Sequence, residues 1–193
     1  MIMNKNNYNK VMYLLKGNAI KLRGLEFEDL ESINIWMNDF DTMTSILRIE
    51  PSVKYFTEIW FKNINTDNTK KILAIEHNNN FIGCVGVNNI SYLDRKSELY
   101  IYIGDKKYRD KGLAKEAIKL FLSYMFDFYN IHKMYLHVRE DNSKAINLYK
   151  KIGFKEEGIF IEEKYIAGKY INIIRMAILK GDFKNEKNSN TPI

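Results

Sequence analysis

A short basic turn near the middle of the chain carries the clearest chemical signal in the sequence. Gly112 stands between an alternating apolar run that ends at Ile103 and a segment of helical periodicity from Leu113 to Phe128. A glycine at a helix start lets a ligand approach free backbone N–H groups closely, and the helix dipole there is positive. Between residues 105 and 119, six lysines and arginines stand against three acids, a local balance of +3. The turn therefore suits a phosphate.

The spacing of the residues in this turn indicates which kind of phosphate loop it resembles. A glycine before a helix more often only connects two elements, but Arg109-x-x-Gly112-x-Ala114 resembles the acyl-CoA pyrophosphate loop of the GNAT acetyltransferase superfamily, whose pattern is Arg/Gln-x-x-Gly-x-Gly/Ala. The Gly-x-x-x-x-Gly-Lys-Ser/Thr and Gly-x-Gly-x-x-Gly patterns of other phosphate loops do not fit. The resemblance implies acetyl-CoA as co-substrate. The residues that it implies as contacts are Ile101, Tyr102, Ile103, Arg109, Lys111, Gly112, Leu113 and Ala114.

A second segment supplies a candidate acid. Acyl transfer from a thioester to an amine needs a base for the ammonium, donors for the carbonyl oxygen and an acid for the departing thiolate. Residues 142–154 resemble the GNAT segment Asn-x-x-Ala-x-x-Leu-Tyr-x-Lys-x-Gly-Phe. By that resemblance, the Tyr149 hydroxyl protonates the CoA sulfur and Asn142 hydrogen-bonds the pantetheine chain. On helical periodicity alone, Tyr149 would be a core aromatic and Asn142 a helix N-cap.

Glu98 is the candidate base. It shares a strand face with Tyr100 and Tyr102, and in many GNAT members a glutamate at this place takes the amine proton, directly or through water. A solvated strand-edge carboxylate is the alternative. The resemblance also assigns the backbone N–H groups near residues 100–102 to the thioester carbonyl. No metal is predicted, because the three histidines, His77, His132 and His137, lack metal-ligand spacing.

The elements that position these residues follow one another as β-α-α-β-β-β-α-β-α-β-β, a mixed α/β arrangement. This is also the order of the GNAT fold. The resemblance implies a central mixed, mostly antiparallel sheet flanked by about four helices, with its fourth and fifth strands, residues 97–104 and 133–139, splayed apart. Residues 38–44 read as a polar turn, and Ser52 as the cap of the second helix. The asparagines at 78–80 predict a hairpin.

Length and composition predict a single domain. The chain has 193 residues, 46% of them hydrophobic, which suffices for a proper core. We expect a GNAT domain over residues 18–180, a loose N-terminal arm over 1–17 and a polar tail over 181–193. The lone cysteine, Cys84, excludes a disulfide framework and reads as a buried core residue. Without a long apolar run or a signal peptide, the expected location is the cytoplasm. The sequence leaves the oligomeric state open, with a homodimer as one option.

The charge is divided along the chain. Residues 26–67 hold nine acids against three cations, a local balance of −6, so with a net charge of +6 the remainder carries +12. A basic part suits an anionic co-substrate, and an acidic part suits a cationic acceptor. A solvated helical surface can also be acidic without a functional reason.

The C-terminal segment bears on the acceptor. Residues 158–176 resemble those of bacterial spermidine/diamine acetyltransferases and of the related ribosomal-protein N-terminal acetyltransferases. The implied reaction is direct attack of a primary amine on acetyl-CoA in a ternary complex, with a polyamine or a basic protein N-terminus as acceptor. Spermidine enzymes carry two acids before the proline of the second helix, whereas Arg48-Ile49-Glu50-Pro51 keeps one acid and adds a cation.

Two other classes of function stay open at this point. The protein could bind acyl-CoA as a sensor without catalysis, but such a protein has no use for the acid that Tyr149 supplies. It could bind nucleic acid through its basic part, but the lysines are scattered over several elements and form no continuous stripe. We therefore expect neither a nucleic acid nor a membrane as partner.

Overall fold

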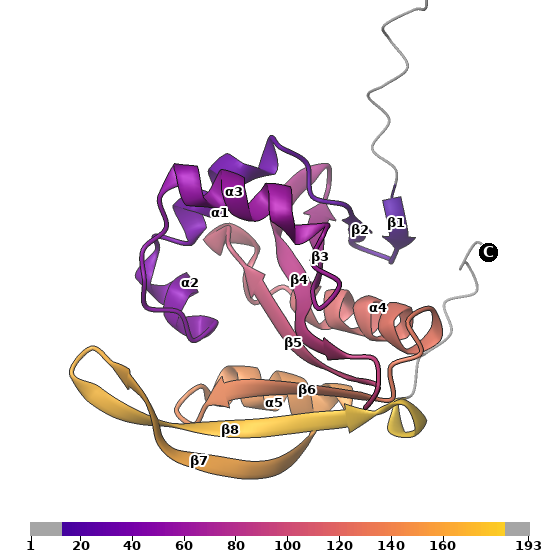
Figure 1. Ribbon diagram of the computed structural model, residues 1–193, viewed down its shortest axis with the longest axis vertical. Helices are drawn as coiled ribbons and strands as arrows, with labels where there is room; N and C mark the ends of the chain where they lie inside the picture. Colours follow the sequence, from indigo (N-terminus) through magenta and orange to yellow (C-terminus); the bar gives the residue numbers. More distant parts are fainter. Residues whose placement is uncertain (1–12, 184–193) are drawn as a thin grey trace, which may run out of the picture.

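The computed structural model describes residues 13–183 and contains one eight-stranded sheet with helices on both faces (Figure 1). The strands follow one another across the sheet in the order β1-β2-β3-β4-β5-β6-β8-β7. They are β1 (Tyr13–Lys16), β2 (Lys21–Arg23), β3 (Lys71–His77), β4 (Asn80–Ser91), β5 (Lys96–Ile103), β6 (Lys133–Arg139), β7 (Lys155–Ile166) and β8 (Lys169–Leu179). The helices are α1 (Asp29–Trp36), α2 (Phe40–Ser45), α3 (Lys54–Ile64), α4 (Leu113–Asp127) and α5 (Ser143–Ile152).

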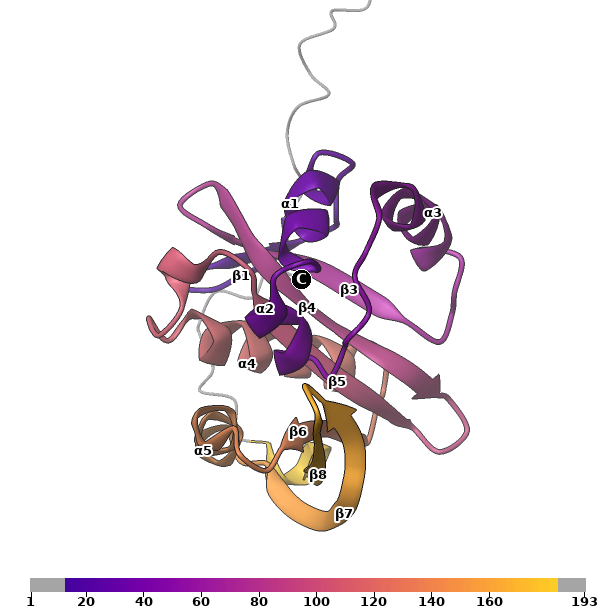
Figure 2. The same cartoon turned by 90° about the vertical axis from the view of Figure 1, so that its left-hand side faces the viewer.

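Strands β5 and β6 separate along their length. They form the only parallel pair of the described sheet, since the long crossover through α4 brings β6 back in the direction of β5. Their pairing covers only residues 96–98 and 133–135, after which the ladder stops. Figure 2 shows β6, β7 and β8 with α5 as a unit set off from the remaining strands. The mixed, mostly antiparallel sheet with two splayed strands is thus confirmed.

Two apolar clusters cover the two faces of the sheet. The larger cluster lies under α4, where Phe121 is fully buried and Leu99 of β5 faces it. The smaller cluster lies under α1 and α3 and includes Tyr102 of β5 and the fully buried Cys84. Burial raises the pKa of the Cys84 thiol to about 12, so it stays an uncharged core residue. Strand β5 therefore presents alternate residues to opposite faces, as its sequence predicts.

The segment between α1 and α3 differs from the sequence prediction in two places. Residues 38–44 do not form a polar turn: the Asp39 side chain accepts a hydrogen bond from the Thr42 N–H (3.0 Å) and caps the short helix α2. The described chain thus has five helices, where about four were expected. Ser52 does not cap α3, because Val53 holds that position and the Ser52 hydroxyl lies 2.9 Å from the Thr57 hydroxyl.

The ends of the described chain are tied to the fold. Strand β1 pairs with β2, although residues 13–16 fall in the predicted loose arm. Near the other end, Phe183 stacks on Phe126 with ring centroids 5.4 Å apart. The rest of the predicted arm and tail, residues 1–12 and 184–193, lies outside the described residues. Among residues 13–183, no helix is both long enough and apolar enough to cross a membrane.

Candidate active site

The turn before α4 has the features of an anion site. Gly112 stands at the helix N-cap with a φ of 78°, in the left-handed region that favours glycine. A Cβ built at this position would meet open space within 4 Å. Among residues 13–183, the N–H groups of Gly112, Leu113 and Ala114 have no hydrogen-bond partner. These free donors at the positive end of a helix dipole suit a pyrophosphate, so the turn fits acetyl-CoA.

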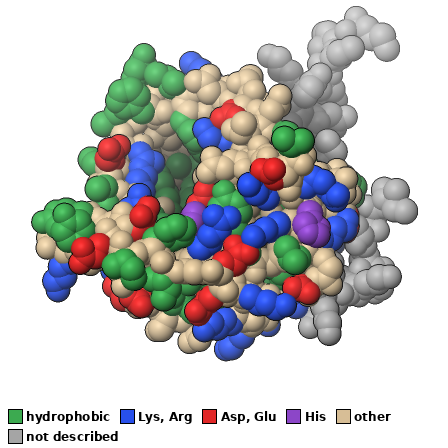
Figure 3. Space-filling view, turned by 60° about the horizontal axis from the view of Figure 1, so that its bottom comes forward, with side chains coloured by type: hydrophobic (Ala, Val, Ile, Leu, Met, Phe, Trp, Pro, Cys, Tyr) green, Lys and Arg blue, Asp and Glu red, His purple; other side chains and the backbone are tan. Residues whose placement is uncertain are grey.

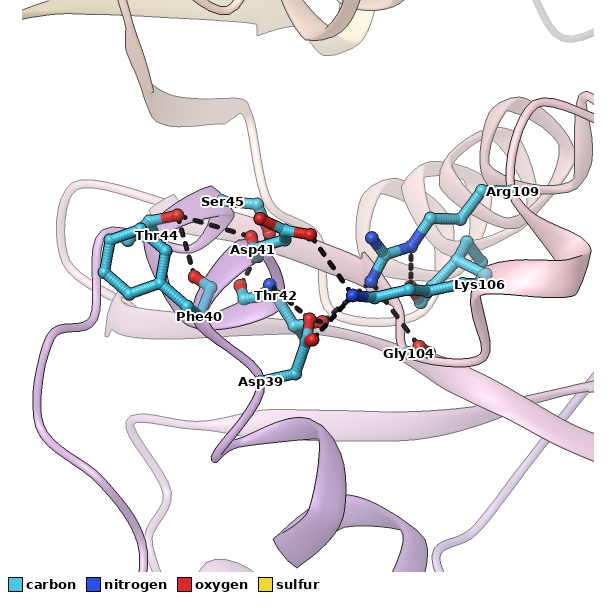
Figure 4. A network of polar contacts seen from close by, with 10 residues as sticks. Asp39, Phe40, Asp41, Thr42, Thr44, Ser45, Gly104, Lys106 and Arg109 are labelled. Atoms are coloured by element: carbon cyan, nitrogen blue, oxygen red, sulfur yellow. Dashed lines mark hydrogen bonds and ion pairs between the residues drawn. The ribbon is translucent and has the colours of Figure 1, made fainter.

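The Arg109 side chain is already bound within the protein. Its Nε donates to the Ile103 carbonyl (2.8 Å). Its Nη2 donates to the Thr42 hydroxyl (2.7 Å), and Figure 4 shows Arg109 beside α2. Beside it, Lys106 reaches Asp39 (2.7 Å) and Asp41 (3.2 Å), and the pKa of Asp39 falls to about 2 through its bonds to Lys106 and Thr42. These contacts join the turn to α2. The loop therefore offers a ligand its backbone, and a direct contact of Arg109 with the pyrophosphate stays a prediction.

A cavity of about 470 Å³ opens where β5 and β6 separate, under α1 and α3. Four of the predicted site residues line it together: Glu98, Ile101, Tyr102 and Tyr149. Figure 3 shows the molecule hollowed on one face, with hydrophobic side chains in the recess. A second cavity of about 250 Å³ shares Ile46, Leu47, Glu98 and His137 with the first, so the two adjoin at Glu98. The candidate acid and base thus face one space.

Helix α5 directs Tyr149 into this cavity. Asn142 begins the helix by accepting a hydrogen bond from the Ala145 N–H (3.1 Å), and Gly153 ends it with a φ of 116°. The half-buried Tyr149 ring packs on Phe154, with centroids 5.8 Å apart. Its hydroxyl makes no hydrogen bond with residues 13–183 and reaches the cavity. Burial raises the pKa of Tyr149 to about 12, so the hydroxyl holds its proton at neutral pH.

Glu98 is held at the point where the two cavities meet. Its Oε1 lies 2.7 Å from Nδ1 of His137, and its Oε2 accepts a hydrogen bond from the Asn89 amide (2.8 Å). The contact with His137 is the largest of the causes that lower the pKa of Glu98. The carboxylate is therefore ionised and engaged at both oxygens.

Two residues of the cavity region were missed by the sequence analysis, and a third was noted there only as an added cation. His137 lies on β6 and was considered only as a metal ligand, and Asn89 lies in an irregular part of β4 with a φ of 53°. Arg48 lines the larger cavity from the loop after α2. Only the pairing of the two strands could have indicated His137: the parallel register places Tyr135 opposite Glu98, and His137 follows two residues later on the same face.

The acidic segment contributes little charge to the cavity. None of the nine acids in residues 26–67, all of which lie in the described chain, lines either cavity. Asp29 is buried against Arg23 at 2.6 Å, Asp39 and Asp41 bind Lys106, and Asp67 binds Lys70. The charged groups that line the larger cavity are Arg48 and Glu98, with His137 as a titratable neighbour. In residues 13–183, no cluster of three or more histidines, cysteines or acids could hold a metal ion.

Comparisons with known proteins agree with this geometry. A family model of the acetyltransferase (GNAT) domain matches residues 20–155. The chain is 35% identical to the spermidine N(1)-acetyltransferase of Vibrio cholerae serotype O1, over 86% of this chain and 96% of that protein. The Escherichia coli K12 enzyme of the same name is also 35% identical, over 87% and 90%. A putative ribosomal N-acetyltransferase of Bacillus subtilis is 25% identical over 54% of this chain and 57% of that protein.

A solved structure extends the likeness to the fold. The spermidine N-acetyltransferase from Vibrio cholerae, crystallised in complex with CoA and spermine, superposes with a TM-score of 0.78 and 35% identity. The match covers 86% of this chain and 98% of that one. With the free N–H groups before α4 and the cavity between the splayed strands, these matches lead to one conclusion. The chain belongs to the GNAT acetyltransferase family and is an acetyl-CoA-dependent N-acetyltransferase.

Proposed function

We propose that this enzyme acetylates a primary amine of a polyamine. The observation that carries the proposal is the 35% identity to spermidine acetyltransferases over nearly their whole length. The shape of the site supports it. The two cavities adjoin at Glu98, and a further carboxylate, Glu163 of β7, lines the smaller one. A chain with several ammonium groups could therefore hold one nitrogen at Glu98 and another at Glu163.

A protein N-terminal α-amine is the second candidate acceptor. Arg48 lines the larger cavity, and its guanidinium repels a polycation but can donate to the carbonyl groups of a peptide. The other walls include apolar side chains, among them Phe56 and Trp60 from α3. Such a surface suits the side chains that follow a peptide N-terminus, which favours the acceptor class of the ribosomal-protein branch.

The same proposal assigns roles to the remaining site residues. The backbone of residues 111–114 binds the pyrophosphate of acetyl-CoA, and that of residues 101–103 binds the pantetheine arm and polarises the thioester carbonyl. Asn142 keeps its capping bond through Oδ1 and has its amide nitrogen for the pantetheine chain. Tyr149 donates to the leaving sulfur. The amine of the acceptor that attacks the thioester lies beside Glu98.

An acetyl-CoA turnover screen tests the proposal. It should compare polyamines, monoamines, amino sugars, amino acids and basic N-terminal peptides at equal concentration. The proposal predicts the highest kcat/KM for a polyamine, and a KM that rises with salt because ions screen the attraction of a polycation over about 8 to 10 Å. Preference for a neutral or anionic amine would refute a polyamine acceptor. Preference for the peptides would select the second candidate.

A further inference from the structure

The contact between Glu98 and His137 spans the gap between the splayed strands. The ladder of β5 and β6 ends at the pair Glu98–Tyr135, and His137 is the next residue on that face of β6. From there its Nδ1 approaches the Glu98 carboxylate to 2.7 Å, while both side chains keep about a quarter of their surface exposed. Both residues line both cavities. The pair is thus accessible from the space where the amine must lie.

Glu98 is poorly suited to accept a proton itself. Each of its oxygens already takes a hydrogen bond, one from His137 and one from Asn89. Donors that bond the ionised form stabilise it, which is why the pKa of Glu98 is lowered. A general base works best when its pKa lies near the working pH. These contacts move Glu98 away from that range.

His137 keeps one ring nitrogen that is not engaged by the Glu98 carboxylate. Because Nδ1 faces a carboxylate, Nδ1 carries the hydrogen in the neutral imidazole and Nε2 carries the free lone pair. The ring is fixed by edge contacts with Tyr135 and Phe160, each with centroids 5.7 Å apart. This arrangement, a carboxylate that orients an imidazole whose other nitrogen takes the proton, is a known design for general bases.

We propose that Nε2 of His137 is the proton acceptor for the amine, and that Glu98 is the residue that positions it. The inference rests on the proposed function, since it requires an amine in the cavity. His137 removes one proton from the substrate ammonium, and the freed nitrogen lone pair forms the N–C bond to the acetyl carbonyl carbon as the C–S bond breaks. The sulfur takes a proton from Tyr149, which regains one from the nitrogen. The proton on His137 leaves to solvent, so two protons leave the nitrogen in total.

The charged and titratable neighbours of His137 allow a pH test. They are Glu98 on β5, Tyr135 on β6, Arg175 on β8, Glu163 and Lys164 on β7, and Arg48 in the loop after α2. None of these neighbours belongs to a residue type that ordinarily changes charge between pH 5 and 8, whereas histidine does. The parent's kcat/KM for the amine should therefore fall as the pH is lowered through this range, because a protonated imidazole cannot act as a base.

His137→Asn is the decisive variant. Asparagine keeps an N–H donor near the place of Nδ1, so the contact with Glu98 can persist, but it has no counterpart of Nε2. The expected loss in kcat/KM at pH 7 is about 10²- to 10³-fold, within the usual contribution of a general base. Without a base, the variant's kcat/KM should follow the share of free amine and rise with pH throughout, with no levelling off in the range where histidine ordinarily changes charge. Its deficit should shrink toward about pH 10, where an alkylamine loses its proton unaided.

Two further variants complete the experiment. His132→Asn makes the same change at an exposed histidine just before β6 and should behave as the parent. Glu98→Gln removes the charge but keeps an oxygen that can accept from Nδ1, so its loss should be smaller than that of His137→Asn. Calorimetry with CoA and the thermal midpoint show whether each variant is folded. If His137→Asn fails to fold, His137→Gln, with the same expected profile, replaces it.

The order of the losses decides the outcome. A larger loss for Glu98→Gln than for His137→Asn would overturn the inference and make Glu98 the base. A folded His137→Asn enzyme within about threefold of the parent at pH 7 would also overturn it. A parent enzyme that acetylates none of the amines in the screen would instead overturn the proposed function, and the inference with it.

Discussion

Replacing Tyr149 by phenylalanine separates its two possible roles. The change keeps the ring, its contact with Phe154 and most of its burial, and removes only the hydroxyl that faces the cavity. That hydroxyl has no hydrogen-bond partner among residues 13–183, so its loss leaves no group of the protein unpaired. We therefore expect the free energy of unfolding to change by less than about 0.5 kcal/mol, and the thermal midpoint by under about 2 °C.

The expected effect on the reaction follows from the environment of the hydroxyl. Burial raises the pKa of Tyr149 to about 12, whereas ordinary thiols ionise near 8.5, so complete proton transfer to the sulfur is uphill. The proton therefore moves only after the C–S bond has largely broken, and in the transition state the hydroxyl acts mainly as a strong hydrogen-bond donor to the developing thiolate. A donor of this kind contributes about 2.7 to 4 kcal/mol, which is a loss in kcat of about 10²- to 10³-fold. The size lies in the lower half of the range for a general acid.

Steady-state kinetics with acetyl-CoA and the best amine of the screen measure this loss. Because the interaction forms in the transition state, kcat and kcat/KM should fall together while the affinity for CoA stays within a fewfold. Tyr165→Phe, the same change on an exposed ring of β7, is the matched control. A Tyr149→Phe enzyme that turns over within about threefold of the parent would refute the reasoning and leave Tyr149 as a packing residue.

Three further predictions follow from the glycines and from α2. Gly112→Val should abolish measurable CoA binding in calorimetry. A β-branched residue disfavours a φ of 78°, and its methyl groups would fill the open space beside the free N–H groups. Unchanged affinity for CoA would refute the predicted anion site. Gly104→Ala should lower the free energy of unfolding, measured in urea, by about 1 to 3 kcal/mol, because the added Cβ would lie 1.9 Å from the Trp36 ring. In the control Gly158→Ala the added Cβ meets nothing within 4 Å, so the free energy of unfolding should change little. Asp39→Asn should lower the thermal midpoint at neutral pH. Because the pKa of Asp39 is lowered in the folded protein, its stabilisation is present above the unfolded pKa of 3.8 and is lost as the pH falls through about 2. The thermal midpoints of the parent and of Asp39→Asn should therefore converge near pH 2. A difference between the two midpoints that stays constant down to pH 2 would refute the prediction.

The parts of the fold that the sequence predicts well are those in which local signals agree with one another. The strand, turn and helix around Gly112 combine alternation, a positive-φ glycine and helical periodicity, and all three appear in the structure. The same holds for α5, where Asn142 caps the first turn and Gly153 ends the last. In both places the backbone geometry depends on neighbouring residues, so a local reading is sufficient.

The parts that sequence analysis missed depend on contacts between distant segments. Helix α2 has only six residues, and its polar composition reads as a turn; Lys106, more than sixty positions away, holds its capping residue in place. The engagement of Arg109 by Thr42 is a contact of the same kind. His137 has no local pattern at all, because its partner, Glu98, lies on another strand, and only the parallel register brings the two together.

The network that joins α2 to the turn before α4 bears on how each substrate affects the binding of the other. Lys106 and Arg109 lead into the backbone that meets acetyl-CoA, and α2 leads into residues 45–48, which line the cavity for the amine. We therefore expect stiffening of the turn by one substrate to reach the wall that the other must contact. Thermodynamic linkage requires the effect to be equal in both directions, so acetyl-CoA should change the dissociation constant of the amine by the same factor as the amine changes that of acetyl-CoA. Cooperative binding of the two substrates would then follow from the ion pairs of one six-residue helix.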